Sequence, residues 1–206
     1  MSVRFLLSLL LGCLLSAQAW ALEEGFDFTI LPNPQPTETG DKIEVLEVFM
    51  YSCPHCFHLE PTMAKWRETQ PANVEFRRMP AVFGPKPELQ ARAFYAAELL
   101  GVQERFTVAM FDAIHVKKLK IADDDAVVAV AEGAGLDGVE FRKALDSFDV
   151  NMKVNRARNA TKDYGIDGVP AVVVNGKYRT SPAQTGSREG LIRVIDQLIS
   201  RETGGS

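Results

Sequence analysis

The first third of the chain carries the apolar pattern of a strand, a helix and a second strand. Residues 43–50 are rich in β-branched and aromatic side chains, as strands are. Residues 53–69 follow as a predicted helix, because Pro54 suits a first helical turn and apolar residues then recur at spacings of four and three. Pro61 is expected to kink this helix. Residues 74–79 begin with the alternation of a second strand.

The middle of the chain has a helical pattern throughout. Gly101 is a stop signal, and Asp123 and Asp124 are expected N-caps. This stretch is therefore expected to form an all-helical block, and the sequence contains no internal repeat. Its predicted helices are 86–100, 102–115, 123–133, 137–147 and 149–164.

The strand signal returns towards the C-terminal end. Residues 171–180 hold two short strand-like runs around Asn175-Gly176, a dipeptide typical of tight hairpin turns. Ser187 then caps a last predicted helix, whose apolar residues form a single stripe. Strands that alternate with helices in this way indicate an α/β protein.

Residues 1–21 have the pattern of a secretory signal peptide. A charge at Arg4 precedes an 11-residue apolar run from Phe5 to Leu15, and small residues follow as a cleavage site. This run is shorter than the about 20 residues of a membrane-spanning helix, and no later stretch comes close to that length. The other interpretation is a lipoprotein signal at Cys13, although a bulky residue precedes it where a small one is expected. Cleavage of the signal peptide leaves a single cysteine pair in an exported protein.

Composition narrows the class of protein further. A chain of 206 residues, 46% of them hydrophobic, with 15 Gly and 11 Pro, is expected to fold as one or two domains. Its net charge of −4 gives no general attraction to nucleic acids, so no nucleic-acid partner is expected. Three cysteines are too few for the disulfide framework of a small secreted scaffold. Any cysteine chemistry is therefore expected to be local.

The candidate chemistry is concentrated in Cys53-Pro54-His55-Cys56, at the start of the first predicted helix. Two cysteines at this spacing can close a disulfide within one helical turn. The unpaired N–H groups and the dipole of a helix start favour a thiolate at Cys53. His55 can add a positive charge or an N–H donor, and Cys56, one turn into the helix, suits a shielded resolving thiol. Stabilising the thiolate favours the reduced form, which makes the pair an oxidant of other thiols.

A metal site and an inert disulfide are the other interpretations of this motif. A structural zinc needs four ligands, and only His55, His58 and the distant His115 could supplement the cysteines. An inert disulfide in so small a loop would constrain the unfolded chain little. Covalent haem is excluded because Phe57 stands where a histidine is required. Redox catalysis is the favoured hypothesis.

These features resemble the thioredoxin superfamily and, within it, the DsbA family of periplasmic thiol:disulfide oxidoreductases. The superfamily resemblance rests on the strand, the C-x-x-C motif, Pro61 five residues after the second cysteine, and Val169-Pro170 before a hairpin. The DsbA resemblance adds Cys-Pro-His-Cys, Glu47 six residues before the first cysteine, and Asn-Gly-Lys-Tyr at residues 175–178. It covers nearly the whole mature chain, and in the helical middle it is only architectural.

The resemblance implies a thioredoxin-like α/β fold, a central mixed sheet flanked by helices, with an inserted all-helical domain. Residues 1–21 would be the cleaved signal peptide, residues 22–84 and 155–206 the thioredoxin-like domain, and residues 85–154 the insert. Isomerases of the DsbC and DsbG kind carry a separate N-terminal dimerisation domain. About 20 residues precede the first long strand of the mature chain, so a monomer is expected.

The resemblance also implies roles for individual residues. Cys53 would be the attacking thiolate and Cys56 the resolving thiol, with the two residues between them completing the catalytic motif. Pro170 would be a cis proline beside the disulfide. Val169 would present backbone polar groups to an extended substrate peptide.

Charged residues around the motif have two interpretations each. Glu47, in an otherwise apolar strand, would be a buried carboxylate beneath Cys56 that assists proton transfer, or else a residue of an edge strand or a solvent-facing strand residue. Glu60 is similar to another acidic position of the family, or is an ordinary exposed helix residue. The lysine that faces the buried glutamate in the family has no clear match, and Arg77 and Arg78 are the candidates.

The remaining singled-out residues are expected to be structural. His58 should be a solvated helix residue, and His115 should lie in or beside the helical packing. Six large apolar residues are expected in the core rather than in a binding groove: Met63, Trp66, Phe94, Phe106, Met110 and Phe111.

The resulting hypothesis is a periplasmic dithiol oxidase that needs no metal or dissociable cofactor. The oxidised pair Cys53-Cys56 would pass its disulfide to reduced, unfolded secretory proteins, and a DsbB-like quinone-linked membrane protein would reoxidise it. The enzyme itself is not expected to insert stably into a membrane. The alternatives are a reductase or isomerase of the same superfamily, and a carrier that binds metal through Cys53, Cys56 and a histidine.

Overall fold

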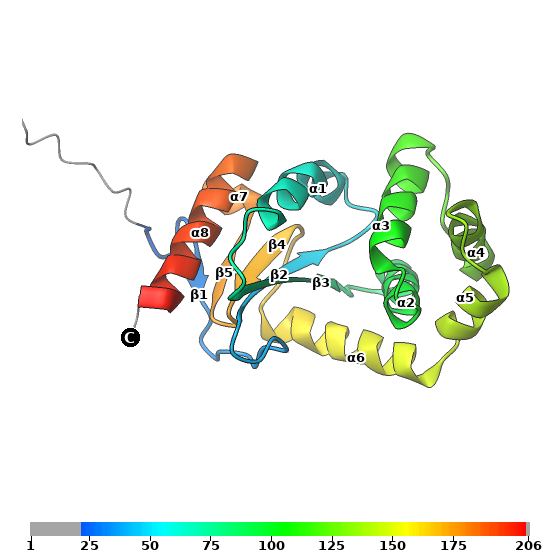
Figure 1. Ribbon diagram of the computed structural model, residues 1–206, viewed down its shortest axis with the longest axis horizontal. Coiled ribbons are helices and arrows are strands. Elements are labelled where there is room, and N and C mark those ends of the chain that lie inside the picture. Colours follow the sequence, from blue (N-terminus) through cyan, green and yellow to red (C-terminus); the bar gives the residue numbers. More distant parts are fainter. Residues whose placement is uncertain (1–21, 205–206) are drawn as a thin grey trace, which may run out of the picture.

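A mixed sheet with helices on both faces occupies one half of the molecule, and a group of helices occupies the other half (Figure 1). The computed structural model describes residues 22–204. Across the sheet the strand order is β1-β5-β4-β2-β3, and β2 is parallel to β3 and antiparallel to β4. The strands are β1 (Thr29–Ile30), β2 (Ile43–Phe49), β3 (Val74–Pro80), β4 (Ala171–Val174) and β5 (Tyr178–Thr180).

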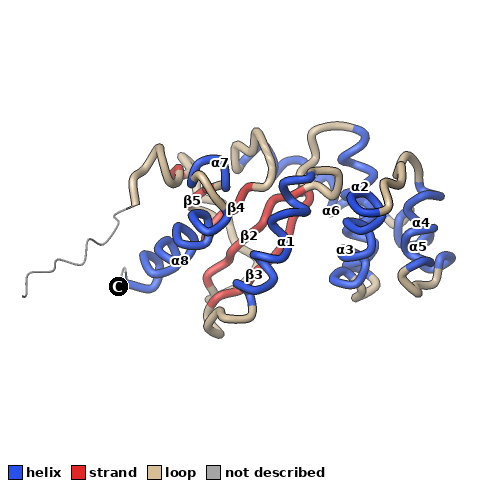
Figure 2. The backbone as a smooth tube through the Cα atoms, turned by 90° about the horizontal axis from the view of Figure 1, so that it is seen from above, coloured by secondary structure: helices blue, strands red, loops and turns tan. Residues whose placement is uncertain are grey.

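The helices divide in the same way, as the view from above shows (Figure 2). On one face of the sheet lie α1 (Pro54–Arg67) and α8 (Arg188–Gly204), with the short α7 (Pro182–Thr185) directly before α8. We call the helices from α2 to α6 the helical block. Its elements are α2 (Pro85–Leu99), α3 (Gln103–Phe111), the π-helical turn Asp112–Val116, α4 (Asp124–Gly133), α5 (Gly138–Leu145) and α6 (Phe148–Asp163). Residues of α6 pack on the other face of the sheet.

The central strand β2 is buried along its whole length and organises the core. Successive residues of a strand point to opposite faces. Val45 therefore packs on one face with apolar residues of α1 and α8, while Leu46 belongs to a second cluster that reaches into the helical block. That second cluster contains Phe94 and Phe106, and all six residues expected in the core are buried.

The predicted elements are found within a few residues of their predicted bounds, and the expected α/β class is confirmed. Asn175 and Gly176 have φ values of 51° and 63°, as a tight hairpin turn requires. Asp123 caps α4 by accepting the Ala126 N–H at 2.9 Å. The expectation that Asp124 is a second cap is wrong, because its carboxylate binds a side chain of α2 instead.

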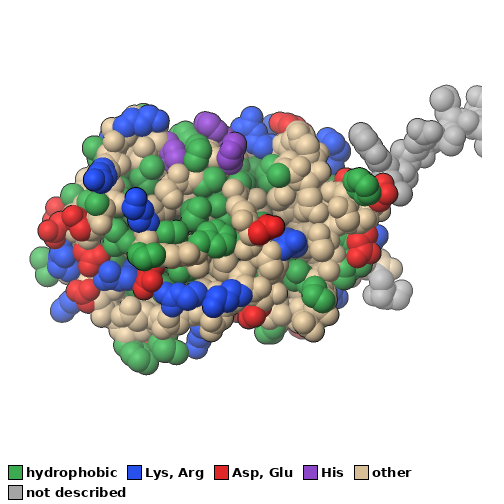
Figure 3. All heavy atoms as spheres, turned by 180° about the vertical axis from the view of Figure 1, so that it is seen from behind, with side chains coloured by type: hydrophobic (Ala, Val, Ile, Leu, Met, Phe, Trp, Pro, Cys, Tyr) green, Lys and Arg blue, Asp and Glu red, His purple; other side chains and the backbone are tan. Residues whose placement is uncertain are grey.

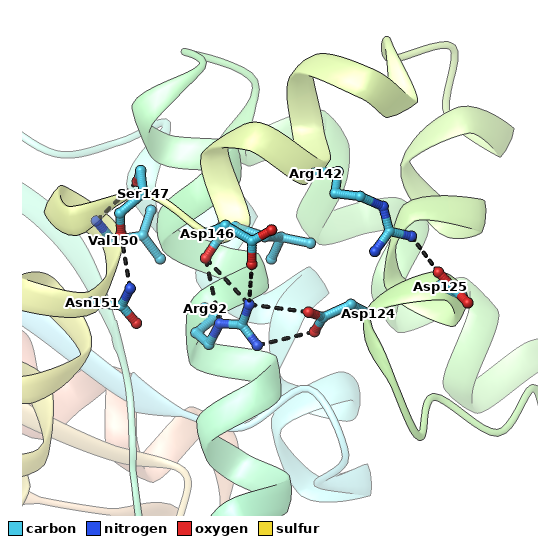
Figure 4. A network of polar contacts seen from close by, with 9 residues as sticks. Arg92, Asp124, Asp125, Arg142, Asp146, Ser147, Val150 and Asn151 are labelled. Carbon is cyan, nitrogen blue, oxygen red and sulfur yellow. Dashed lines mark hydrogen bonds and ion pairs between the residues drawn. The ribbon is translucent and has the colours of Figure 1, made fainter.

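That interaction belongs to an ion-pair network on the helical block (Figure 4). Arg92 of α2 donates to Asp124 of α4 at 3.0 and 3.1 Å and to Asp146, just after α5, at 3.0 Å. Arg142 of α5 pairs with Asp125 of α4. Three helices of the block are therefore joined by charged contacts on the outside of their shared apolar core.

Helix α6 connects the helical block with the C-terminal part of the sheet. Helix α6 runs unbroken from Phe148 to Asp163, and it contains the predicted domain boundary between residues 154 and 155.

Among residues 22–204, no helix is both long enough and apolar enough to cross a bilayer. The predicted signal peptide, with Cys13, lies outside the described residues.

Candidate active site

The Cys-x-x-C motif lies where β2 passes into α1. Cys53 is the N-cap of α1, and its backbone N–H donates to the Met50 carbonyl at 3.1 Å. Pro54 occupies the first helical position, where a missing N–H costs no helical hydrogen bond. Both cysteines are free thiols; Cys53 is partly exposed and Cys56 is fully buried. The first sulfur is thus open to a reaction partner and the second is shielded.

The two cysteine thiols differ in pKa because their surroundings differ. A hydrogen bond from the Cys56 thiol lowers the pKa of Cys53 to about 6, helped by the backbone N–H groups of Cys56 and His55 and by the His55 charge, while burial opposes the shift. The pKa of Cys56 is raised above its usual range, by that same hydrogen bond and by burial. At neutral pH the reduced pair therefore holds a thiolate at Cys53 and a proton at Cys56.

A distant segment completes the surroundings of Cys53. The peptide bond between Val169 and Pro170 is cis, as the resemblance implied for this proline. The Val169 carbonyl lies 3.3 Å from the Cys53 sulfur, which donates to it in the thiol form. The fold therefore joins two loops that are 116 positions apart in the sequence. The structure brings Val169 and Pro170 to the site, as expected.

Glu47 lies on the α1 side of β2, and its side chain is buried together with that of Arg78 on β3. The two are register partners, and Arg78 Nε donates to Glu47 Oε2 at 3.0 Å, with each side chain only 2% exposed. Burial raises the pKa of Glu47, and the charge of Arg78 opposes that shift. The Glu47 charge also contributes to the raised pKa of Cys56. The interpretation of Glu47 as a solvent-facing residue is wrong, and Arg78 is its cation.

Arg78 also lies close to the carboxylates of Glu60 and Glu104. Its Nη2 donates to Glu60 of α1, which is only partly buried. Its Nη1 makes no hydrogen bond to any described residue and lies 3.6 Å from a carboxylate oxygen of Glu104 in α3. Glu104 also accepts from Arg67 of α1 at 3.0 Å. This charged cluster connects the sheet, the active-site helix and the helical block.

The three histidines gather at one edge of the molecule (Figure 3). His55 and His58 are exposed on α1, as expected for His58. His115 comes from the π-helical turn, and its Nε2–H donates to the Tyr51 carbonyl at 2.7 Å. Its ring stacks on Phe57, with centroids 4.8 Å apart and planes 12° apart. His115 therefore supports the loop before Cys53, and nothing in the sequence pattern indicated that contact.

A groove of about 1070 Å³ opens beside the motif on the sheet side. It is lined by His55, by Val169 and Pro170, and by residues of β5, α7 and the start of α8. The groove thus adjoins Cys53 through His55, two residues further along the chain, and through Val169, whose carbonyl contacts the Cys53 sulfur. Among residues 22–204, no group of three His, Cys, Asp or Glu side chains is placed to hold a metal ion.

Comparisons with known proteins match this geometry. The family model for the DSBA-like thioredoxin domain matches residues 44–188. The thiol:disulfide interchange protein DsbA of Burkholderia cepacia is 40% identical over 189 residues, which cover 91% of this chain and 89% of that protein. DsbA of Pseudomonas aeruginosa PAO1 is 36% identical over 188 residues, with 91% and 89% covered.

Solved structures agree with the sequence relatives. A crystal structure of P. aeruginosa DsbA superposes with a TM-score of 0.86 at 35% identity, covering 89% of this chain and 96% of that one. The oxidoreductase NmDsbA1 of Neisseria meningitidis gives a TM-score of 0.78 at 29% identity, with 90% and 97% covered. The chain therefore belongs to the DsbA-like thioredoxin family and is a thiol:disulfide oxidoreductase.

Proposed function

We propose that this oxidoreductase works as a disulfide oxidase, which gives its disulfide to reduced client proteins. The observation that carries the proposal is the separation of the two cysteine acidities, with the pKa of Cys53 lowered to about 6. A thiolate stabilised in the reduced protein favours that form over the disulfide. The oxidised protein then gains free energy by taking two electrons from a client dithiol.

The proposed reaction begins with a client thiolate. It attacks Cys53 Sγ of the oxidised pair, the Cys53–Cys56 bond breaks, and Cys56 leaves and takes up a proton. A second client thiolate attacks the client sulfur of the mixed disulfide, and Cys53 leaves as a thiolate. The client ends with one disulfide, and the enzyme ends with a thiolate at Cys53 and a thiol at Cys56. The disulfide itself accepts the electrons, so no cofactor is required.

Residues around the pair have proposed roles in this exchange. His55 supports the thiolate through its charge and backbone N–H, and Pro54 begins the helix that presents those donors. Glu47 is the buried group that passes a proton to and from Cys56. Val169 and Pro170 bind the client backbone, since the Val169 carbonyl stands beside the reacting sulfur.

The cellular setting follows from the same proposal. The signal-like residues 1–21 support export to the periplasm of a Gram-negative cell, where disulfides persist. The clients would be newly exported, unfolded proteins, and a DsbB-like quinone-linked membrane protein would reoxidise the pair. We also propose that residues 22–84 with 155–206 form the thioredoxin-like domain, that 85–154 form the insert, and that the protein is a monomer.

A redox titration of Cys53 and Cys56 against glutathione tests the direction of the reaction. The expected result is a couple more oxidising than that of thioredoxin, together with rapid oxidation of a reduced test protein. Cys53→Ser should abolish that oxidation, because it removes the attacked sulfur. A couple as reducing as that of thioredoxin would make the protein a reductase, and test-protein oxidation by Cys53→Ser would overturn the mechanism.

A further inference from the structure

A second groove, of about 320 Å³, opens on the helical-block side of the motif. Ser52 lines it directly before Cys53, and its N–H donates to Gln90 of α2 at 3.0 Å. The floor is apolar and comes from α2, the π-helical turn and the loop before α4. Its apolar side chains include those of Leu89, Ile114, Leu119 and Ile121.

The rim of this groove is positively charged in a protein whose net charge is −4. Lys86 and Lys120 line it, and Lys117 and Lys118 precede it on the same loop. All four lysines are exposed. Within residues 22–204, only Lys117 of the four has an ion-pair partner, Asp112 at 2.7 Å. On the face of the molecule that Figure 3 shows, Lys and Arg side chains lie near the histidines.

The carboxylates that follow the groove in sequence do not neutralise these lysines. Asp123 is occupied as the cap of α4, and Asp124 is bound by Arg92 on the outside of the block. The groove therefore combines an apolar floor with unpaired cations. Such a surface complements a chain segment that carries acidic and apolar side chains together.

The residues before and after Cys53 line different grooves. His55 lines the first groove and Ser52 lines the second, and Cys53 is between them in the chain. A client cysteine that reacts with Cys53 can therefore place its flanking residues in either groove. An extended chain rises about 3.3 Å per residue, so two or three residues beside the client cysteine span roughly 7–10 Å.

We propose that the second groove is a client-binding site, which selects acidic and apolar residues on one side of the client's reacting cysteine. This inference rests on the proposed oxidase function. The lysines act mainly on the rate of encounter, because exposed charges steer association and are screened by salt. The apolar floor then holds the segment while the thiolate attacks.

Two single-cysteine peptides test this proposal, one with the flank Asp-Leu-Glu and one with Lys-Leu-Lys, made with the flank on either side of the cysteine. The measurement is the rate at which excess peptide reduces the oxidised protein, found by acid quench and thiol labelling. Each rate is divided by the same peptide's rate with hydroxyethyl disulfide, since flanking charges change the thiol's own acidity. The wild-type protein should prefer the acidic flank on the order of tenfold at low salt, and the preference should shrink as salt rises.

Two variants test whether the second groove causes the preference for the acidic flank. Lys86→Glu/Lys120→Glu changes two exposed, unpaired lysines and should reverse the preference. Lys143→Glu, an exposed lysine of α5 outside the groove, should keep it. Equal normalised rates for both flanks, or an unchanged preference in the double variant, would overturn the proposal that the second groove binds clients. The oxidase proposal would still stand. Failure of every peptide to reduce the wild-type disulfide would instead contradict the oxidase proposal.

Discussion

Each face of β2 carries one buried glutamate, and the two glutamates have different surroundings. Glu44 and Glu47 lie on opposite faces of the strand, and both are almost fully buried, with 2% and 1% of the whole residue exposed. Each takes an arginine of β3, because residues 77 and 78 also point to opposite faces. Glu47 lies on the face covered by the active-site helix, and Glu44 on the face turned away from it.

The partners show what each face does. Glu44 accepts from Arg77 at 3.2 Å and from the Glu38 backbone N–H at 3.1 Å, and Arg77 is 29% exposed. This pair fastens the segment before β2. Arg78 is 2% exposed and is surrounded by carboxylates of three elements. Both faces thus bury an acid, but only the charge of Glu47 contributes to the raised pKa of Cys56.

The largest expected difference between the faces is in stability. Arg78→Met leaves Glu47 buried without its cation, so unfolding of the oxidised protein by urea should show a loss of about 3–5 kcal/mol. Arg77→Met should lose about 1–2 kcal/mol, because Arg77 is already partly exposed to solvent and Glu44 keeps a backbone donor.

The pH dependence of that loss sharpens the comparison. Without Arg78, the pKa of Glu47 rises further, so its protonation at low pH removes the unpaired charge. The destabilisation by Arg78→Met should therefore shrink as the pH falls from 7 to 5. Equal losses in the two arginine variants would show that the faces do not differ.

The next difference is kinetic. Glu47→Gln removes the proposed proton acceptor beneath Cys56, so release of a bound glutathione from a Cys53 mixed disulfide by Cys56 should slow at least about tenfold. The measurement is an acid-quenched reaction of the reduced protein with oxidised glutathione. Glu44→Gln is the matched control and should leave this rate unchanged, since its side chain faces the other cluster. Equal rates in wild type and Glu47→Gln would remove Glu47 from the mechanism.

The smallest expected effect concerns the acidity of Cys53. Its alkylation rate in the reduced protein should rise through a midpoint near pH 6, because the hydrogen bond from Cys56 and the donors of the helix start favour the thiolate. Both Glu47→Gln and Glu44→Gln should keep the midpoint within about half a pH unit, since neither carboxylate is among the causes of the shift.

The same pKa fixes the sign of a stability effect. Because the folded pKa of Cys53 is lowered, the extra stability of the reduced protein is fully present above the pKa of an unfolded thiol, about 8.5, and is lost as the pH falls through about 6. The oxidised protein lacks this titration. A reduced form whose stability relative to the oxidised form did not change across that window would contradict the low pKa.

Local patterns in the sequence were enough to predict the elements that build the site. Proline at a first helical turn marks the start of α1, and Asn175-Gly176 marks the hairpin between β4 and β5. The elements without a signal are short: β1 has two residues, α7 has four, and the π-helical turn of five residues forms the end of a predicted helix. Pieces of this length have little preference of their own and form where the surrounding structure pairs or covers them.

The sequence alone determined the strand-to-helix start with its cysteine pair, because helix starts, strand alternation and hairpin turns depend on neighbouring residues. Only the tertiary structure decided that Arg78 and not Arg77 neutralises Glu47, that Val169 lies against Cys53, and that His115 supports the loop before it. These contacts join segments that are far apart in the chain. Several residues of suitable type are present in the sequence, and only the packing of the fold determines which of them come into contact. The chemistry of the thiol pair is therefore local in origin, and its control is a property of the fold.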